Sequence, residues 1–377
     1  MNLTQVSSIA RKTIATVTIT VILYSIGYFS APYVTEFYYS IRPRKEKPVI
    51  IYGKLPPIKF NSLPTNSSEP EYILNTKDLK LPRITPELVS VYKVKKPVPS
   101  FSSGKNAQIK ATALSLPEDQ RVSELKGNLY KWLDPPYSRE LNINISTNTL
   151  DYLLKVANNR SLYFPSPSLS TTAEADAKGI LSTLGFLRDQ LYQNNLKSKI
   201  TYGKVVNGRI LETQTPIDYM AAKVDFSRTI YKVPIYGPSY DDGLLQVVVG
   251  SLPATEDKNK AYLKYIKIKA HEWSIETDTF GRYPPISLNE AWKRVSSNQG
   301  AFAKVKLKNS SSFETYRTVT LSKVFIQDIT IGYYDSEEVQ DYMQPVYIFQ
   351  GNFLTSGNES GDVVIYYPAV SESYIAR

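Results

Sequence analysis

Alternation of apolar and polar residues is the clearest pattern after residue 85, and it predicts strands. Ile266 and Ile268 alternate with lysines, as in a strand with one buried face. Asn207-Gly208 separates two further strand-like runs and predicts a two-residue hairpin. The remaining expected strands cover residues 88–94, 200–206, 209–213, 244–249, 328–333, 346–349 and 363–367.

Two helix starts carry matching capping boxes. Residues 171–174 (Thr-Thr-Ala-Glu) and 287–290 (Ser-Leu-Asn-Glu) place a hydroxyl three positions before a carboxylate, so that each satisfies an orphan backbone amide. Gly185 and Gly300 lie where these helices would end. A third, weaker copy covers residues 106–116. Because strands follow each helix, we predict repeated units of one helix and an antiparallel sheet.

The fold class that we expect is therefore α+β, with an N-terminal transmembrane helix followed by these repeated units. The expected boundaries are a short tail (1–12), a transmembrane helix (13–35), a Pro-rich extended spacer (36–84) and three α+β units (85–165, 166–280 and 281–377).

The transmembrane prediction rests on 23 consecutive residues without a charge, 13–35. A helix of that length reaches about 34 Å, enough for a hydrocarbon core of about 30 Å. A cleaved signal peptide is the alternative, but Phe29 stands three positions before a cut after Ala31, where a small residue is preferred. Basic residues flank both ends. Those that follow the segment favour a cytoplasmic C-terminal domain, whereas the absence of cysteine and the resemblance given below favour the outside, which we choose.

Composition narrows the chemistry further. The chain of 377 residues has a formal charge of +10 and no cysteine, which excludes disulfides, thiolate catalysis and zinc-cysteine sites. The positive charge favours an anionic neighbour such as lipid headgroups or a wall polymer. No recognition motif accompanies the charge, so we expect no specific nucleic acid partner.

A search for catalytic motifs finds little. His271 is the only histidine, and no Gly-x-Ser-x-Gly elbow is present to supply a nucleophile. Asp241-Asp242-Gly243 lacks the distal ligands of a calcium loop and predicts a tight turn. The pairs Ser198-Lys199 and Ser322-Lys323 have no distinctive context. We therefore expect no cofactor, no metal site and no enzymatic activity, and a Ser-based cell-wall hydrolase stays only as an alternative.

The aromatic residues near the C-terminus are the most distinctive feature. They are compatible with two core strands joined by an acidic loop, or with a surface that binds a partner, since alternation would send about half of them outward. The candidate partner-binding residues are Tyr333, Tyr334, Tyr342, Tyr347, Phe349, Tyr366 and Tyr367.

These segments carry a resemblance. Residues 290–292 (Glu-Ala-Trp), 331–334 (Ile-Gly-Tyr-Tyr), 344–349 (Gln-Pro-Val-Tyr-Ile-Phe) and 366–370 (Tyr-Tyr-Pro-Ala-Val) resemble uncharacterised single-pass envelope proteins of candidate-phyla bacteria, which also share residues 52–60. More distantly, the chain resembles YycH/YycI-type extracytoplasmic regulators with PepSY-like repeats. The resemblance implies a single-pass protein of the cell membrane with an extracytoplasmic C-terminal domain, and it carries over no catalytic residue.

Together these observations predict a membrane-anchored, non-catalytic envelope protein that binds another envelope protein as a regulator or scaffold. A structural subunit of a cell-surface assembly is the alternative.

Overall fold

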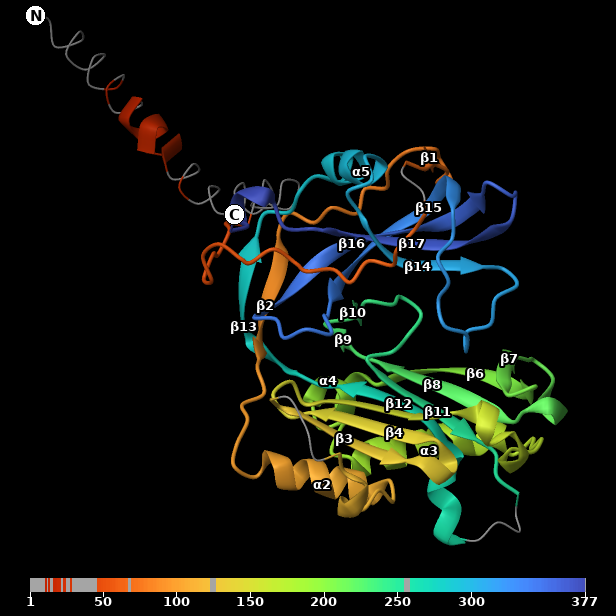
Figure 1. Ribbon diagram of the computed structural model, residues 1–377. Coiled ribbons are helices and arrows are strands. Elements are labelled where there is room, and N and C mark those ends of the chain that lie inside the picture. The colour runs from red at the N-terminus through yellow and green to blue at the C-terminus, as the bar shows by residue number, and fades with distance from the viewer. Residues whose placement is uncertain are drawn as a thin grey trace, which may run out of the picture. The chain divides into compact units, whose positions relative to one another are not determined.

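Two large β-sheets organise residues 48–377 in the computed structural model (Figure 1). Residues Met1–Lys47 and Pro48–Arg377 form separate units. The structure describes residues 46–66, 69–122, 127–253 and 258–376 and, nearer the N-terminus, positions 11, 13, 16–21, 23, 24 and 28.

The first sheet has eight strands in the order β3-β4-β5-β12-β11-β8-β6-β7, and every neighbouring pair is antiparallel. Its strands are β3 (Leu129–Asp134), β4 (Arg139–Asn144), β5 (Thr149–Leu154), β6 (Lys197–Val206), β7 (Arg209–Glu212), β8 (Ala221–Ser227), β11 (Leu245–Gly250) and β12 (Tyr265–His271). Helices α2 (Ser103–Ala113) and α3 (Leu169–Thr183) cover one face (Figure 1). Ala173 and Ala177, one turn apart, are both fully buried and let α3 approach the sheet closely.

The second sheet has nine strands, with β15 and β16 at its centre. Its strands are β1 (Glu71–Leu74), β2 (Val89–Lys95), β9 (Thr229–Ile230), β10 (Val233–Tyr236), β13 (Ser274–Tyr283), β14 (Ala301–Leu307), β15 (Leu321–Tyr334), β16 (Tyr342–Thr355) and β17 (Ser360–Pro368). Strands β1 and β10 run parallel to β15, and the other pairs are antiparallel. Helix α5 (Leu288–Ser296) packs on one face through Leu288, Ala291 and Val295.

Residues 48–84, which we predicted as part of an extended spacer, lie along the nine-stranded sheet. Leu55 is fully buried, and its N–H donates to the carbonyl oxygen of Tyr374 at 2.8 Å. The N–H of Leu63 donates to the carbonyl oxygen of Phe302 at 2.8 Å. Backbone amides of this Pro-rich segment are thus paired with β14 and with the C-terminal residues, so the segment packs against the rest of the folded unit. Residues 36–45 lie outside the described residues.

The predicted α+β fold of successive repeated units is wrong, because the chain forms two large sheets and is mostly β. Both α2 and α3 cover the same eight-stranded sheet, although we assigned them to different units. Strand β12 pairs with β5, more than a hundred positions earlier in the chain. Strands β1 and β10 join β15 across the predicted boundaries. Local helix and strand patterns do not indicate which strands pair. The prediction of successive units failed because strands that are distant in the sequence pair here.

The predicted transmembrane helix over residues 13–35 is also corrected. Among the residues that the structure describes, no helix is both long and apolar enough to cross a membrane. The run lacks charge, but its described part is rich in threonine, and the hydroxyl of Thr20 donates to the carbonyl oxygen of Thr16. Absence of charge is therefore a weaker criterion than high hydropathy. This finding contradicts the single-pass membrane anchor, the signal anchor, the membrane contact through 13–35 and the localisation built on them; the tail 1–10 lies outside the described residues.

Several local predictions are confirmed. Asn207 and Gly208 both have positive φ, 50° and 77°, as a two-residue hairpin between β6 and β7 requires. The hydroxyl of Ser287 accepts the N–H of Glu290 at 3.2 Å and caps α5. The capping box at Thr171 is wrong, because α3 already begins at Leu169.

Candidate functional site

The eight-stranded sheet has one apolar face and one polar face. The apolar face, under α2 and α3, carries buried residues such as Leu141, Tyr152 and Ile268. On the other face, directly paired residues on seven neighbouring strands form a polar row, since opposite residues of antiparallel strands share a face. The row runs Lys131, Asn142, Asp151, Lys269, Gln246, Asp225 and Lys199.

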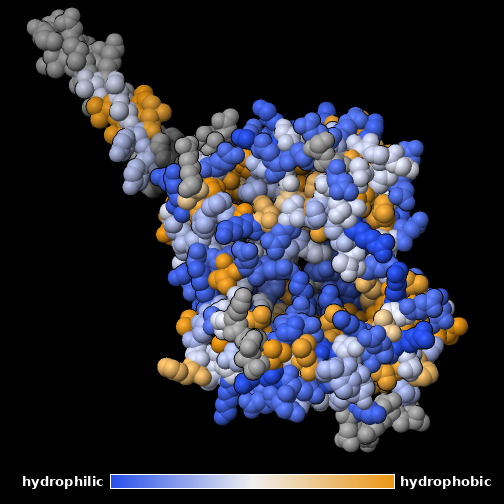
Figure 2. Space-filling model, viewed as in Figure 1, coloured by the Kyte–Doolittle hydropathy of each residue, from blue (hydrophilic) through white to orange (hydrophobic). Residues whose placement is uncertain are grey.

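Part of this polar face forms the floor of a cleft beneath the nine-stranded sheet, which we call the inter-sheet cleft. It consists of two adjoining cavities of about 720 Å³ and about 940 Å³, which share Arg209, Lys223, Asp242, Ser312 and residues 314–317. Strand β14 and its flanking residues supply the opposite wall. The space-filling view shows a mostly hydrophilic hollow between the two halves of this unit (Figure 2).

Cations outnumber carboxylates in the inter-sheet cleft. Its cationic residues are Lys155, Arg209, Lys223, Lys267, Lys304, Lys306, Lys308 and Arg317, and its acidic residues are Asp241, Asp242, Glu314 and Glu359. A cleft with an excess of one charge between low-dielectric walls attracts ligands of the opposite charge.

Lys223 is the most deeply placed of these cations. It is 5% exposed, forms an ion pair with Asp242 and lies 3.4 Å from Asp225. Burial lowers the pKa of Lys223, but the two carboxylates outweigh burial and raise it above its ordinary value. Asp225 also accepts the N–H of Gly243 at 3.0 Å and the amide of Gln246 at 2.8 Å. Lys223 is therefore a charged structural centre of the cleft rather than a free contact.

Five other cations of the cleft form no direct side-chain contact with a hydrogen-bond acceptor or a carboxylate in the described part of the chain. Among the described residues, the side chains of Lys155, Arg209, Lys267, Lys308 and Arg317 form no hydrogen bond or ion pair. Lys267 is only partly exposed, and burial lowers its pKa, opposed by Asp242. These groups are available to an anionic ligand.

The loop 308–320 closes one end of the inter-sheet cleft by reaching from β14 to the β6–β7 hairpin. The hydroxyl of Ser312 donates to a carboxylate oxygen of Glu212 at 2.8 Å, and the N–H of Glu212 donates to Ser311 at 3.2 Å. A Cβ on Gly203 would stand 2.8 Å from the ring of Phe313, so this glycine makes room for the loop.

The structure brings the seven candidate partner-binding aromatics together, but in the interior. Tyr342 is half-buried, and the other six are buried, five of them at 6% exposure or less. Alternation does send them to two faces of the nine-stranded sheet. However, α5 covers one face, while Phe60 and Tyr240 pack on the other. Six of the seven side chains are therefore not exposed to a partner in the folded protein, and the binding role of the set stays a prediction.

His271 and the acidic turn have structural surroundings. The Nε2 atom of His271 lies 3.9 Å from a carboxylate oxygen of Asp335, and the ring is buried against Trp273. Asp242 pairs with Lys223, and Asp241 lies 2.9 Å from the ammonium of Lys304. Within the described ranges, no cluster of three potential metal ligands occurs.

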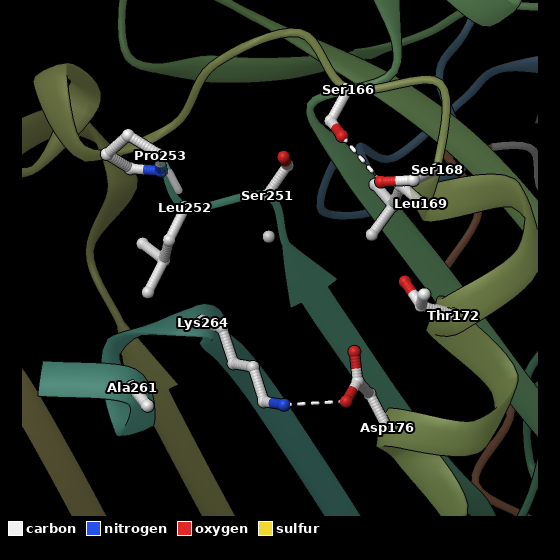
Figure 3. Close-up of a pocket in the computed structure, with 11 residues that line it drawn as sticks. Ser166, Ser168, Leu169, Thr172, Asp176, Ser251, Leu252, Pro253, Ala261 and Lys264 are labelled. Carbon is white, nitrogen blue, oxygen red and sulfur yellow. Dashed lines mark hydrogen bonds and ion pairs between the residues drawn. The ribbon is translucent and has the colours of Figure 1, made fainter. Parts of the chain in front are cut away.

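A smaller pocket of about 300 Å³ beside the start of α3 gathers several hydroxyl groups (Figure 3). The Ser166 and Ser168 hydroxyls contact each other at 2.8 Å, and Lys264 donates to Asp176 at 2.6 Å. Burial lowers the pKa of Lys264, but Asp176 and Tyr265 outweigh it and raise the pKa above the ordinary value. Asp176 already engages the Lys264 ammonium, and the Ser166 and Ser168 hydroxyls contact each other, so this pocket does not support the Ser-based hydrolase.

Comparisons with known proteins add no function. No protein-family model matches the chain, and no curated protein matches it. Among solved structures, the chain is similar to an uncharacterised protein from Eubacterium rectale, at 13% identity and a TM-score of 0.42, over 80% of this chain and 88% of that chain. A likeness at this level carries no argument. The resemblance to YycH/YycI-type and candidate-phyla proteins stays a prediction.

Our sequence reasoning missed the inter-sheet cleft. One signal was present: Lys223 and Asp225 alternate with Ala222, Val224 and Phe226 in one short strand. Such charges predict that a second, polar layer faces the strand. The other lining residues come from segments as distant as 153 and 360, and no sequence pattern connects them.

Proposed function

We propose that this is a non-catalytic binding protein that holds an acidic segment of another protein in the inter-sheet cleft. The observation that carries the proposal is the set of five unpaired cationic side chains in a cleft with few carboxylates. Guanidinium and ammonium groups form charge-assisted hydrogen bonds to carboxylates, which are about twice as strong as neutral ones. An acidic ligand would supply the acceptors that Lys267, Arg209 and Arg317 lack.

The mixed lining favours a polypeptide over a uniformly charged polymer. Leu153, Val248, Ile210 and Phe313 add apolar surface beside the cations, and apolar contacts stabilise bound side chains. The four carboxylates of the cleft would repel the closely spaced charges of a polyphosphate or teichoic-type chain. Glu314 and Glu359, whose carboxylates form no hydrogen bond or ion pair with the described residues, would accept hydrogen bonds from peptide N–H groups. The two adjoining cavities also exceed the space that a single amino acid needs.

The test uses a fluorescently labelled Glu-rich peptide and the full chain, with binding followed by anisotropy. The same peptide with every Glu changed to Gln, and inorganic polyphosphate as competitor, form the other arms. We expect the Glu peptide to bind, and binding to weaken with added salt because salt screens exposed charges. Lys267→Gln and Arg317→Gln should each reduce affinity about tenfold, or roughly 1.4 kcal/mol, as expected for a lost charge-assisted bond.

Lys105→Gln, an exposed lysine on α2 outside the cleft, is the matched control and should bind like the parent. An equal loss of affinity for the Glu peptide in the control and in the cleft variants would show non-specific attraction to a positively charged protein. That result would overturn the proposal. Tight binding of polyphosphate without binding of the Glu peptide would overturn the polypeptide as the ligand and would indicate an anionic polymer instead.

A further inference from the structure

A second cationic pocket lies on the helical side of the eight-stranded sheet, away from the inter-sheet cleft. It has a volume of about 300 Å³ and lies between α2 and the turn that follows α3. The polar residues that line it are Ser103, Asn106, Lys110, Asn148, Thr183 and Arg188.

Two cations meet in this pocket. Lys110 is partly buried, donates to the side-chain oxygen of Asn148 at 3.1 Å and lies 4.4 Å from the centre of the Phe186 ring. Arg188 is exposed and, within the described part of the chain, its side chain has no hydrogen bond or ion pair. The protein thus holds two like charges near each other and gives one of them no partner.

The backbone next to the pocket is shaped to admit the Arg188 side chain. Gly185 has a φ of +81°, and a Cβ there would lie 3.2 Å from a guanidinium nitrogen of Arg188. A larger residue would be strained by its backbone conformation and would crowd the guanidinium. Glycine at this position therefore both ends α3 and keeps Arg188 over the pocket.

The electrostatics of the pocket favour an anion. None of the residues that line it is acidic. Burial lowers the pKa of Lys110 to about 8; Arg188 adds to the shift, and Glu272 opposes it. The Glu272 carboxylate is already occupied, since it accepts the N–H groups of Leu187 and Asp189 at 2.5 Å each. Its charge offsets part of the repulsion between the two cations, but Glu272 does not line the pocket.

The end of α3 does not supply the missing acceptors either. The carbonyl oxygens of Ile180, Leu181 and Ser182 accept the N–H groups of Leu184, Phe186 and Gly185. A purely structural explanation is that both cations only interact favourably with the negative, C-terminal end of the α3 dipole. That explanation does not account for the polar pocket between the two cations. It also does not account for the polar residues of α2 and Asn148 that line this pocket.

We propose that this pocket binds a small oxyanion, a phosphate or carboxylate group, between Lys110 and Arg188. The planar guanidinium donates two parallel hydrogen bonds to such a group, and the Lys110 ammonium supplies a third. Asn106, Asn148, Ser103 and Thr183 line the same space. The site is independent of the inter-sheet cleft and of its proposed peptide ligand.

The test titrates the full chain with inorganic phosphate and, separately, with acetate, against chloride at constant ionic strength. Phosphate should raise the melting temperature in a concentration-dependent way because it binds the folded state. Calorimetry near pH 8.5 in buffers of different ionisation enthalpy should show proton uptake, since a bound anion raises the pKa of Lys110. A free phosphate and the carboxylate of a larger ligand are distinguished by which of the two anions binds.

Arg188→Gln should abolish both the thermal shift and the proton uptake, and as an exposed side chain it should leave folding intact. Lys110→Met should remove the proton uptake even if it lowers stability. Lys105→Gln, on the same helix, should behave like the parent. Equal stabilisation of all three variants by phosphate, or binding without proton uptake in the parent, would overturn the assignment.

Discussion

Arg228 and Asp335 lie 3.3 Å apart where the two sheets join, and neither side chain is exposed to solvent. Arg228 follows β8 of the eight-stranded sheet, whereas Asp335 follows β15 of the nine-stranded sheet. The same guanidinium lies 3.1 Å from Asp189 and donates to the carbonyl oxygen of Trp273 at 2.9 Å. One buried cation thus connects four chain segments and both sheets. Removing one member of such a group leaves the others as uncompensated buried charges.

Arg228→Met should therefore destabilise the protein by about 3–5 kcal/mol, the usual cost of breaking a buried ion pair from one side. The measurement is the free energy of unfolding in urea. Arg294→Met is the matched control, because Arg294 pairs with Glu290 at 2.9 Å on the surface and exposed helix ion pairs contribute little to stability. Similar losses of unfolding free energy for the two variants would show that the buried ion pairs of Arg228 do not stabilise the junction of the two sheets.

His271 should make stability depend on pH. Burial lowers its pKa below the ordinary 6.5; Asp335 opposes the shift, and Arg228 adds to it. Below about pH 6.5 the unfolded chain takes up a proton that the folded protein refuses, so stability falls as the pH falls. The loss is at most about 1.4 kcal/mol per pH unit, and it stops at the lowered pKa of the folded state.

His271→Gln removes this proton and should flatten the dependence between about pH 7.5 and pH 5.5, measured by urea unfolding at each pH. Glu272 acts in the opposite direction, because burial raises its pKa and the folded state keeps the extra proton. Since Glu272 is present in both proteins, the difference between them isolates His271. Parallel curves for parent and variant would refute the prediction.

The two capping boxes should respond differently to the same change. Ser287→Ala removes the hydroxyl that accepts the N–H of Glu290 and should cost about 1 kcal/mol of unfolding free energy. Thr171 lies inside α3, and its hydroxyl donates to the carbonyl oxygen of Ser168. Thr171→Ala should therefore change stability by less than about 0.5 kcal/mol. If the two variants melt at the same temperature, Ser287 is not an effective cap.

The C-terminal aromatics should behave as core residues. Phe349 is fully buried between β15, β17 and α5, so Phe349→Ala should cost about 3–5 kcal/mol, from lost burial and a cavity. Phe101 is fully exposed, and Phe101→Ala should stay within about 0.5 kcal/mol of the parent. Thermal melts compare the two. A Phe349→Ala protein that is as stable as the parent would mean that this face is open to a partner after all.

Local features of the fold could be predicted because they depend on a few neighbouring residues. Asn207-Gly208 tolerates the positive φ of a tight hairpin, and Ser287 reaches the amide of Glu290 within one turn. The alternation at Ile266 and Ile268 identified the buried side of β12. In each case the residues of one short segment determine its backbone conformation and its burial pattern.

Strand pairing and burial were decided only by the tertiary structure. The pattern of β12 is compatible with many partners, yet it pairs with β5 and β11 because their apolar faces share the cover of α2 and α3. Tyr334 and Tyr347 lie on opposite faces, and both are buried because different segments cover each face. Likewise, the inter-sheet cleft exists only because Lys267 of β12 and Arg317 of the loop 308–320, fifty positions apart, line the same cavity in the folded protein. The amphipathic pattern of a segment indicates that one of its faces must be covered. Which other segment covers that face depends on competition among all apolar faces of the chain.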